Sequence, residues 1–523
     1  MNNILVIRLG SIGDVVLASA PILNLKLSFP DSKIFFLTRE QNAPLAGMMT
    51  GVDETISLPR KISLLELFRT GEFFDKHGID IICDLHGNFR SNYLMRHIAA
   101  PVKAQYPKRR RERFMAVKLH RSSANPPHTI DLYNAAVTAC GGDVFTRRPL
   151  LRPSRISRPV ANKPLVAIAP GASYPTKQWP PKRFRELVTR LRAENAADIV
   201  LLLTEKDKPL YESDVMDKSP DIRVIIDASL PDIAAEIASA NLLLSNDSGL
   251  MHIGSAVGTP VLALFGPTHP TLGFSPRGWH DRIIQVEEPC RPCSLHGKRP
   301  CYRDKQYCFD RIEVDYVFGQ IIDALEKKSE TAAALFIDRD GTLIKEKSFL
   351  SDPEQVDPEE GSIEAIRLGR DMGFKIIVLS NQSGVARGYF DLEQVDRVNE
   401  RIRSLFAAKG APLDDILYCP YYEHGSVEPF AQKSFMRKPA AGMVERTARQ
   451  YGINPFASYC IGDKLSDVRL AYATGGKGIL VRTGYGQDSM NRMASHDSFP
   501  PETVADNLLD AVKYIGKTLG IKP

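Results

Sequence analysis

The stretch ALFIDRDGT, residues 334–342, decides the fold of the last third of the chain. Its four apolar residues, 334–337, predict a buried strand, and Asp338 and Asp340 follow where that strand ends. In a parallel α/β sheet, the carboxyl end of a strand opens into a crevice where ligands bind. One carboxylate can attack phosphorus while the other protonates the leaving oxygen, so the pattern predicts cleavage of a phosphate ester. Because carboxylates and phosphate repel each other, the reaction needs a divalent cation, and oxygen ligands favour Mg²⁺.

Three further motifs separate this stretch from a surface turn or a calcium loop. Ser380-Asn381-Gln382 ends the predicted strand 375–380, and Arg437-Lys438 supplies cations for a phosphate. Gly462-Asp463-Lys464 ends the predicted strand 459–462, and Asp467 follows four residues later. A salt-bridged loop would not recur at successive strand ends, so the set indicates a catalytic site. A fourth strand is predicted over 478–481.

These motifs, in this order, resemble the haloacid dehalogenase-like (HAD-like) hydrolases, which implies a Rossmannoid phosphatase domain. Residues 380–390, 418–430 and 460–467 resemble the subgroup of D-glycero-D-manno-heptose 1,7-bisphosphate and histidinol phosphatases, and the heptose enzymes match better. The resemblance implies a nucleophile at Asp338 and a general acid/base at Asp340. It implies Mg²⁺ ligands at Asp338, Asp463 and the main chain of Asp340. The phosphate and the substrate's other groups would bind to Ser380, Asn381, Lys438, Arg387 and Arg437.

One loop departs from that subgroup. Many of its members carry zinc on a C-x-H and C-x-C pair just before the Arg-Lys motif. Here Cys419 keeps one ligand position, but Tyr421, Ser434 and Met436 occupy the others. One thiol cannot form a four-ligand site, so we expect no zinc at Cys419.

The first 325 residues carry a separate set of motifs. Strands are predicted over 4–7, 34–38 and 79–84, and then over 165–169, 198–203, 223–226, 242–245 and 261–265. A helix is predicted over 15–26. Glycine-containing turns follow the first strand of each series, at residues 8–14 and 170–173, and NDSGLMH (246–252) leads into a helix start that can hold a diphosphate. The spacing is not that of a dinucleotide fingerprint, so we expect no redox cofactor.

Together these motifs resemble the family-9 glycosyltransferases, the ADP-heptose heptosyltransferases of lipopolysaccharide core biosynthesis. The resemblance implies a GT-B fold, in which one Rossmann-like half binds the acceptor and the other binds the nucleotide-sugar. It also implies that the transfer reaction needs no metal. It implies that Asp14 is the base for the acceptor hydroxyl and that Lys177 contacts the donor diphosphate. Other implied donor contacts are Ser173, Glu205, Asp247, Ser248, Gly249 and His252.

Charge is unevenly distributed along the chain. Residues 1–163 contain 24 Lys and Arg against 13 Asp and Glu, whereas the whole chain has a net charge of +6. Part of the excess lies in 108–111, with Arg113, Lys118 and Arg121 close behind. No nucleic-acid motif accompanies it, so we expect no nucleic acid. The excess falls in the half that the resemblance assigns to the acceptor, and the resemblance then implies an acidic, lipid-linked glycan acceptor at the inner membrane face. A solvated loop is the other interpretation of the basic run.

No stretch predicts a transmembrane segment, and the sequence indicates a cytoplasmic protein with peripheral membrane attachment.

The densest cysteine cluster is Cys290, Cys293, Cys301 and Cys308. Its spacing allows a four-thiolate zinc site, although it does not form two CxxC pairs; reduced structural thiols are the alternative.

A Pro- and Arg-rich linker is predicted at 147–164. The expected domains are therefore 1–160 (acceptor half), 161–328 (nucleotide-sugar half) and 332–523 (phosphatase).

Both resemblances involve the same sugar, heptose. A multifunctional enzyme with two activities is therefore predicted, a heptosyltransferase and a heptose 1,7-bisphosphate 7-phosphatase. Two alternatives remain. The phosphatase-like domain is a non-catalytic interaction module, or it acts on histidinol phosphate or another sugar phosphate. The sequence leaves open the acceptor, ADP or GDP in the donor, the anomer of the bisphosphate and the oligomeric state.

Overall fold

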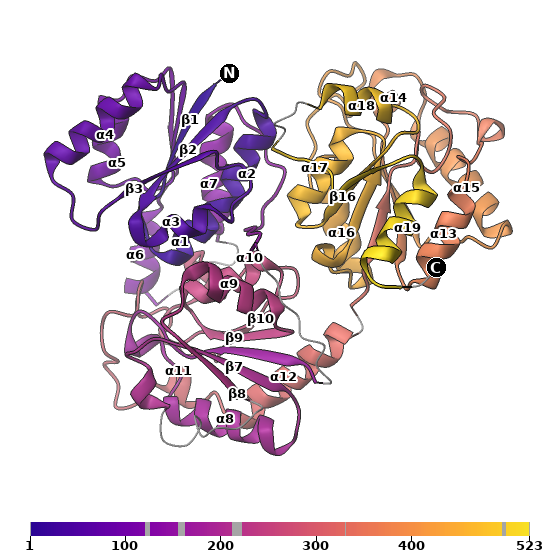
Figure 1. The fold of residues 1–523 in the computed structure, drawn as a ribbon. Helices are drawn as coiled ribbons and strands as arrows, with labels where there is room; N and C mark the ends of the chain where they lie inside the picture. Colours follow the sequence, from indigo (N-terminus) through magenta and orange to yellow (C-terminus); the bar gives the residue numbers. More distant parts are fainter. Residues whose placement is uncertain are drawn as a thin grey trace. The chain divides into compact units, whose positions relative to one another are not determined.

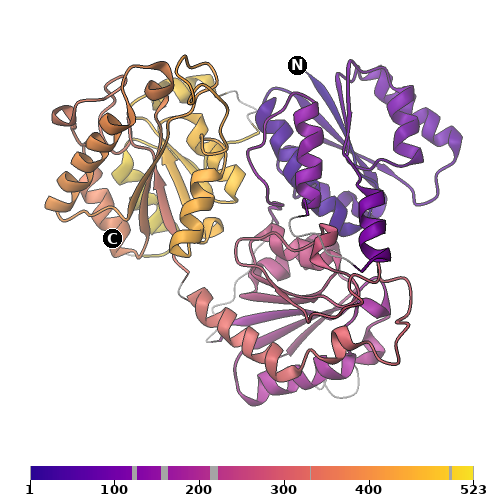
Figure 2. The same ribbon diagram turned by 180° about the vertical axis from the view of Figure 1, so that it is seen from behind.

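The computed structural model describes residues 2–120, 126–154, 163–211, 222–329, 331–493 and 498–521. Contacts divide the chain into two compact units, Met1–Asp143 with Arg147–Ser329 and Val144–Thr146 with Glu330–Pro523. The first unit contains two parallel sheets and the second contains one, each with helices on both faces (Figures 1 and 2). This is the predicted α/β class. Arg121 and residues 155–162 of the predicted linker lie outside the described residues.

The first sheet has the strand order β3-β2-β1-β4-β5. The predicted helix 15–26 is in fact two helices that meet at Ala18, because Pro21 has no N–H to donate to Leu17. The strands are β1 (Asn3–Ile7), β2 (Lys33–Arg39), β3 (Glu54–Leu58), β4 (Ile81–Asp84) and β5 (Val102–Gln105); the helices are α1 (Ile12–Leu17), α2 (Ser19–Ser28), α3 (Ala43–Ala46), α4 (Leu64–Lys76), α5 (Phe89–His97), α6 (Arg110–Lys118) and α7 (Thr129–Ala139).

The second sheet has the order β11-β10-β9-β6-β7-β8. Helices α8 and α12 pack side by side against it (Figure 2). The strands are β6 (Leu165–Ala169), β7 (Asp198–Leu203), β8 (Ile222–Ile226), β9 (Leu242–Asn246), β10 (Val261–Leu264) and β11 (Arg282–Ile284); the helices are α8 (Pro181–Ala193), α9 (Leu230–Ser239), α10 (Gly249–Val257), α11 (Tyr307–Asp310) and α12 (Val314–Ser329).

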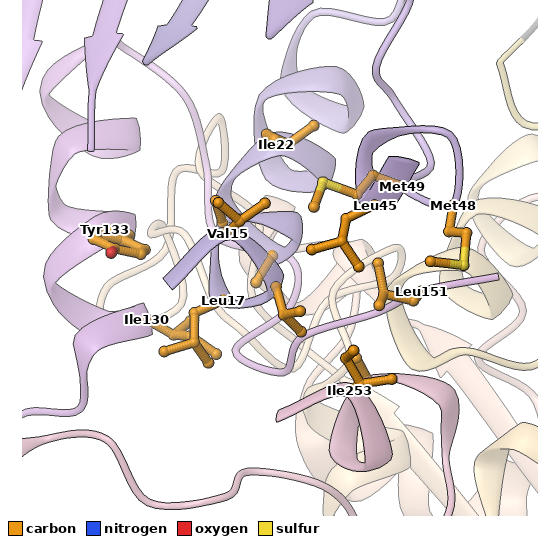
Figure 3. Packing of buried hydrophobic residues seen from close by; sticks show 14 of the residues in the cluster. Val15, Leu17, Ile22, Leu45, Met48, Met49, Ile130, Tyr133, Leu151 and Ile253 are labelled. Carbon is orange, nitrogen blue, oxygen red and sulfur yellow. The ribbon is translucent and has the colours of Figure 1, made fainter. Parts of the chain in front are cut away.

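These two sheets share one hydrophobic core. Val15 and Leu17 of α1 and Ile253 of α10 belong to the same buried cluster (Figure 3). Leu151 also belongs to it, and its N–H donates to the carbonyl oxygen of Ala256 at 2.8 Å. Two Rossmann-like halves joined in this way form the GT-B arrangement that the motifs predicted.

The third sheet has the order β14-β13-β12-β15-β16-β17, with every pairing parallel. Its buried residues form a separate core. The strands are β12 (Ala334–Ile337), β13 (Lys375–Asn381), β14 (Asp415–Cys419), β15 (Tyr459–Gly462), β16 (Lys477–Val481) and β17 (Thr503–Ala505); the helices are α13 (Ser362–Asp371), α14 (Ser383–Arg387), α15 (Leu392–Ala408), α16 (Gly442–Tyr451), α17 (Leu465–Thr474), α18 (Gly486–Arg492) and α19 (Leu508–Thr518).

Among the described residues, no helix has the length and apolar character needed to cross a membrane.

Candidate active sites

In the second unit, three neighbouring strands bring the predicted motifs together. Strands β13, β12 and β15 lie side by side, and Asn381, Asp338 and Asp463 stand at or just beyond their carboxyl ends. Asp338 continues the ladder, since its N–H donates to the carbonyl oxygen of Ile461 at 2.9 Å. The first crevice that the sequence predicted is therefore assembled from consecutive strand ends.

Lys438 lies at the centre of this site. Its buried ammonium donates to Asp338 Oδ1 at 2.7 Å and to the carbonyl oxygen of Leu379 at 2.7 Å, and it pairs with Asp467 Oδ1 at 2.6 Å. The Asn381 amide fixes the backbone of Lys438 through two hydrogen bonds of 3.0 and 3.1 Å. Burial opposes ionisation of Asp338, but attraction to Lys438 and Lys464 outweighs it and holds the Asp338 pKa below its ordinary value. Asp338 is therefore an ionised carboxylate, as a nucleophile requires.

Asp340, the second carboxylate of the motif, lies at the same site. Its carboxylate accepts from Arg339 Nε at 3.0 Å, from Gln382 Nε2 at 2.9 Å and from Ser380 Oγ at 3.4 Å. Arg339 is almost fully buried and is itself held by Asn399. These contacts give Asp340 a fixed orientation.

Three carboxylates gather where a cation is expected. One oxygen from each of Asp338, Asp463 and Asp467 lies within 4.8 Å of the others. Burial and the charge of Asp338 raise the Asp463 pKa to about 8, and burial also raises the Asp467 pKa, to about 6. Asp463 Oδ1 is buried without a hydrogen bond, with Lys464 Nζ 3.4 Å away. The three carboxylates repel one another, and Asp463 Oδ1 accepts no hydrogen bond. Both properties fit a site for a hard divalent cation.

A cavity of about 420 Å³ opens beside this cluster, with Asp338 in its wall but neither Asp463 nor Asp467. Of the predicted residues, Asp338, Asp340, Ser380, Asn381, Arg437 and Lys438 line it, whereas Arg387 does not. The sequence motifs did not identify Glu346, Phe349 or Tyr485 as lining residues. Glu346 and Phe349 follow the DxDGT motif in a loop whose path sequence alone does not give.

In the first unit, Asp14 lies between two cavities. It lines one of about 660 Å³ and another of about 320 Å³. Its Oδ2 pairs with Arg8 Nη2 at 2.6 Å and accepts from Ser11 Oγ at 2.9 Å. Burial opposes ionisation, but the Arg8 guanidinium and these hydrogen bonds keep the Asp14 pKa below its ordinary value. Arg8 orients Asp14, and no sequence motif had indicated this pair.

The smaller cavity collects most of the predicted donor contacts. Its walls include Ser173, Lys177, Asp247, Ser248, Gly249 and His252 together with Asp14. Lys177 Nζ pairs with Asp247 Oδ2 at 2.7 Å, and Thr268 Oγ1 donates to the same carboxylate oxygen at 2.7 Å. Burial lowers the His252 pKa to about 4, so this imidazole is neutral at pH 7.

Glu205 is not brought to this cavity. It is exposed after β7, and its carboxylate lies 4.0 Å from Lys208. The buried carboxylate of that turn is Asp207, which accepts from the Thr204 hydroxyl at 2.6 Å.

Glycines let α1 and α10 approach closely at the edge of the donor cavity. A Cβ on Gly13 would lie 2.6 Å from His252 Cδ2, and one on Gly249 would lie 2.8 Å from Ile12 Cβ. Side chains at these positions would push the two helix starts apart, so glycine is required there by packing.

The larger cavity is strongly basic. Arg110, Arg111 and Lys108 line it, as do Arg8 and Arg113. Burial and repulsion from Arg110 and Arg8 lower the Lys108 pKa to about 8. Arg8 pairs with Asp14, but a group of cations of this size still attracts an anionic ligand.

The cysteine cluster lines another cavity, of about 490 Å³, which includes Cys290, Cys293, Cys301 and Cys308. Among the described residues, no three of their sulfur atoms lie within 4.8 Å of one another, so zinc geometry is not assembled. All four are free thiols, and burial raises the pKa of Cys293 and Cys308 to about 11.

Comparisons with known proteins divide the chain at the same place. The model of glycosyltransferase family 9 (heptosyltransferase) matches residues 69–302. In the second unit, the HAD-hydrolase-like model matches 435–511, and the polynucleotide kinase 3 phosphatase model matches 333–467.

The chain is 40% identical over 158 residues to the D-glycero-beta-D-manno-heptose-1,7-bisphosphate 7-phosphatase of Escherichia coli K12, covering 30% of this chain and 82% of that protein. The corresponding protein of Haemophilus ducreyi is 36% identical over 184 residues, covering 35% and 97%. The solved structure of E. coli ADP-heptose lipopolysaccharide heptosyltransferase II is 20% identical, with a TM-score of 0.49, covering 63% and 100%.

The fold and the two sites define a GT-B glycosyltransferase joined to a HAD-like phosphatase. The chain belongs to the family of heptose-1,7-bisphosphate 7-phosphatases through its second unit, and its first unit is a family-9 glycosyltransferase domain.

Proposed function

We propose that this chain is a bifunctional enzyme of heptose metabolism. Its second unit removes the 7-phosphate of heptose 1,7-bisphosphate, and its first unit transfers heptose from ADP-heptose to an acidic glycan acceptor. The observation that carries the proposal is the complete set of charged groups around Asp338 in the second unit. In the first unit, a cavity with the predicted donor contacts shares Asp14 with a basic cavity. A non-catalytic module would not need a buried Asp338–Lys438–Asp467 network, because burying charges is costly.

In the phosphatase reaction, Asp338 attacks phosphorus and forms an aspartyl phosphate while the sugar oxygen leaves. Asp340 donates a proton to that oxygen. It then takes a proton from water, which attacks phosphorus and releases inorganic phosphate and free Asp338. Lys438 and the side chains of Ser380 and Asn381 bind the phosphoryl oxygens.

Mg²⁺ would be held by Asp338, Asp463 and the main-chain carbonyl of Asp340, where it would neutralise charge on the phosphoryl group. Asp463 Oδ1 supports this assignment, because it is buried without a hydrogen bond and has the Lys464 ammonium 3.4 Å away. Asp467 is paired with Lys438, so its role would be to hold that ammonium.

In the transferase reaction, Asp14 takes the proton from the acceptor hydroxyl, whose oxygen then bonds to the anomeric carbon of heptose. The bond to the nucleoside diphosphate breaks, and its charge is taken up by Lys177 and by the amides at the start of α10. Ser173, Asp247, Ser248, Gly249 and His252 would surround the donor. Glu205 would reach the nucleoside only if its exposed turn changed conformation.

The acceptor would bind in the basic cavity, at the carboxyl edge of the first sheet. Cations follow four strands of this sheet: Arg60 follows β3, Arg39 ends β2, Arg90 follows β4, and residues 108–111 follow β5. Exposed apolar side chains lie near them, namely Leu64, Leu65, Phe89 and Phe114. Such an edge suits an acidic, lipid-linked glycan and peripheral attachment to an anionic membrane face.

The boundaries 1–160, 161–328 and 332–523 are our proposed domains, in which the first two share one core. Zinc at the four thiols is a separate prediction; it would need the sulfurs to move closer together. Elemental analysis of the purified chain tests it, with Cys293→Ser as the control.

One assay separates the alternatives for the second unit. Purified protein with Mg²⁺ is given each anomer of heptose 1,7-bisphosphate, and phosphate release is compared with that of Asp338→Asn. We expect release at least about a thousandfold above the variant, because the nucleophile is lost. Release equal to that of the variant would leave a non-catalytic module, and faster turnover of histidinol phosphate would select that substrate instead.

A second assay addresses the transferase. Heptose transfer from ADP-heptose and from GDP-heptose is measured with the wild type and with Asp14→Ala. Transfer by Asp14→Ala at the wild-type rate would refute the assignment of the base.

A further inference from the structure

The loop between β14 and α16 closes without the ligand set of a zinc site. The buried thiol of Cys419 lies 3.9 Å from the carbonyl oxygen of Tyr421, which also accepts from Arg437 Nη1 at 3.2 Å. Ser434 accepts from the backbone N–H groups of Arg437 and Met436 at 3.1 and 3.2 Å. Positions 419, 421, 434 and 436, which correspond to the zinc ligands, are therefore joined through hydrogen bonds of this loop and of Arg437.

Tyr422, the next residue, contacts two arginines from different parts of the fold. The guanidinium carbon of Arg387, at the end of α14, lies 4.5 Å from the centre of the Tyr422 ring. That of Arg437 lies 4.9 Å from the same ring. Hydrogen bonds at both backbone groups of Tyr422 fix the ring: its N–H donates to Phe430 and its carbonyl accepts from Gly425, both at 3.0 Å. One aromatic ring therefore holds two cations together.

In the part of the chain that the structure describes, neither Arg387 nor Arg437 pairs with a carboxylate, and Arg387 Nε is buried without a hydrogen bond. Glu423, the acidic neighbour of Tyr422, pairs with His424 and Lys433, and it attracts Arg437 without forming an ion pair with it. Burial and the nearby Arg387 charge lower the Arg437 pKa. Two half-buried guanidinium groups close to each other repel. An anion bound next to both would remove this repulsion and accept hydrogen bonds from them.

The third wall of this cluster is Phe349. Its backbone φ is 66°, and that of Ser348 is 36°, which is a left-handed conformation that a bulky side chain rarely adopts. Both residues line the catalytic cavity, and the Phe349 ring lies 6.0 Å from the Arg387 guanidinium and 4.7 Å from the Tyr389 ring. The Arg387 guanidinium therefore lies near two aromatic rings, those of Tyr422 and Phe349. Arg437 lines the catalytic cavity.

We propose that Tyr422 is a positioning residue that takes the place of the zinc staple. It holds Arg387 and Arg437, to which the resemblance already assigns the substrate's other groups, in place for the second, non-reacting phosphate. The inference rests on the proposed phosphatase function. While one phosphate of a bisphosphate meets Asp338, the other reaches Arg437 in the cavity wall and the positive charge of Arg387 close to it. A monophosphate leaves them unused.

The test compares Tyr422→Leu with Tyr422→Phe, which keeps the aromatic face. For heptose 1,7-bisphosphate we expect Tyr422→Leu to raise KM about tenfold with kcat within about twofold, because only ground-state binding is lost. KM for heptose 7-phosphate stays unchanged, and Tyr422→Phe restores the wild-type values. Tyr451→Leu, which removes another tyrosine of this unit with no arginine on its ring, is the matched control. A zinc-selective chelator leaves wild-type turnover unchanged.

Equal changes with both substrates, or a lower kcat alone, would overturn the inference and indicate a merely structural role. If the wild type hydrolyses neither ester, the proposed function fails, and a readout independent of turnover decides this inference. Nitrogen-15 arginine NMR would detect the Nε–H signals of Arg387 and Arg437, assigned with Arg→Lys variants, during titration with inorganic phosphate. Both signals should shift on phosphate addition in the wild type and in Tyr422→Phe, but not in Tyr422→Leu; an unchanged response in Tyr422→Leu sinks the proposal.

Discussion

At the residue scale, Asp463 links magnesium binding to pH. Its carboxyl pKa, raised from 3.8 to about 8 by burial and by Asp338, means that the metal-free native state keeps a proton that the unfolded state has lost. The metal-free second unit therefore loses stability as pH rises between these two values. Mg²⁺ requires the ionised carboxylate, so it must displace that proton.

We accordingly predict that Mg²⁺ binds more tightly as pH rises from 6 to 8 and releases about one proton at pH 7. Calorimetric titration in buffers of different ionisation enthalpy measures both quantities. In Asp463→Asn the proton release should disappear together with most of the affinity. A dissociation constant that does not depend on pH would contradict the assignment.

Lys108 gives a second pH dependence with the opposite direction. Burial and neighbouring arginines lower its pKa to about 8, so the ammonium is charged below pH 8 and loses its charge above it. We predict that KM for the acceptor rises severalfold between pH 7.5 and 9, while KM for ADP-heptose changes less. Steady-state kinetics of heptose transfer provides the measurement, and Lys108→Arg, which stays charged, should flatten the profile.

At the element scale, the crossing of α1 and α10 depends on two glycines. Gly13→Ala would place a Cβ against the His252 ring, and we predict a loss of about 1–3 kcal/mol of unfolding free energy, together with weaker heptose transfer. Phosphatase activity should remain. Gly319→Ala, on α12 with open space around it, is the control and should be neutral or slightly stabilising. Urea unfolding of the two variants decides between these outcomes.

The sequence predicted central elements better than edges. Strands β6, β7 and β15 were predicted at their observed bounds, because strands buried on both faces are continuous apolar runs. The missed strands, which are β3, β5, β11, β14 and β17, all lie at sheet edges, where partial exposure weakens the pattern.

The candidate sites follow the same rule. Motif residues that follow central strands, such as Asp338 and Asp14, stand where sequence placed them. Arg8, Glu346 and Phe349 were not recognised, because their roles depend on long-range pairing and loop paths. The resemblance implied a donor contact at Glu205, but the buried carboxylate of that turn is Asp207. A strand end can be predicted, whereas the direction of one side chain within a turn cannot.

At the scale of the whole molecule, the two units have separate cores and separate sites. We predict two thermal transitions, of which Mg²⁺ raises only one. At a concentration 100 times its dissociation constant, a ligand adds about 2.7 kcal/mol. For a unit of this size that corresponds to roughly 5–10 °C. Differential scanning calorimetry with and without Mg²⁺ measures the shift, and Asp463→Asn should abolish it.

Asp14 stands in the walls of both transferase cavities, which also share Leu272, Phe274, Leu295 and His296. The two cavities are therefore adjoining chambers with a common partition. A single compound that carries an acidic glycan mimic on one arm and a nucleotide on the other could fill both. Such a bisubstrate inhibitor would gain affinity from the tether alone, since its second arm binds at a high effective concentration.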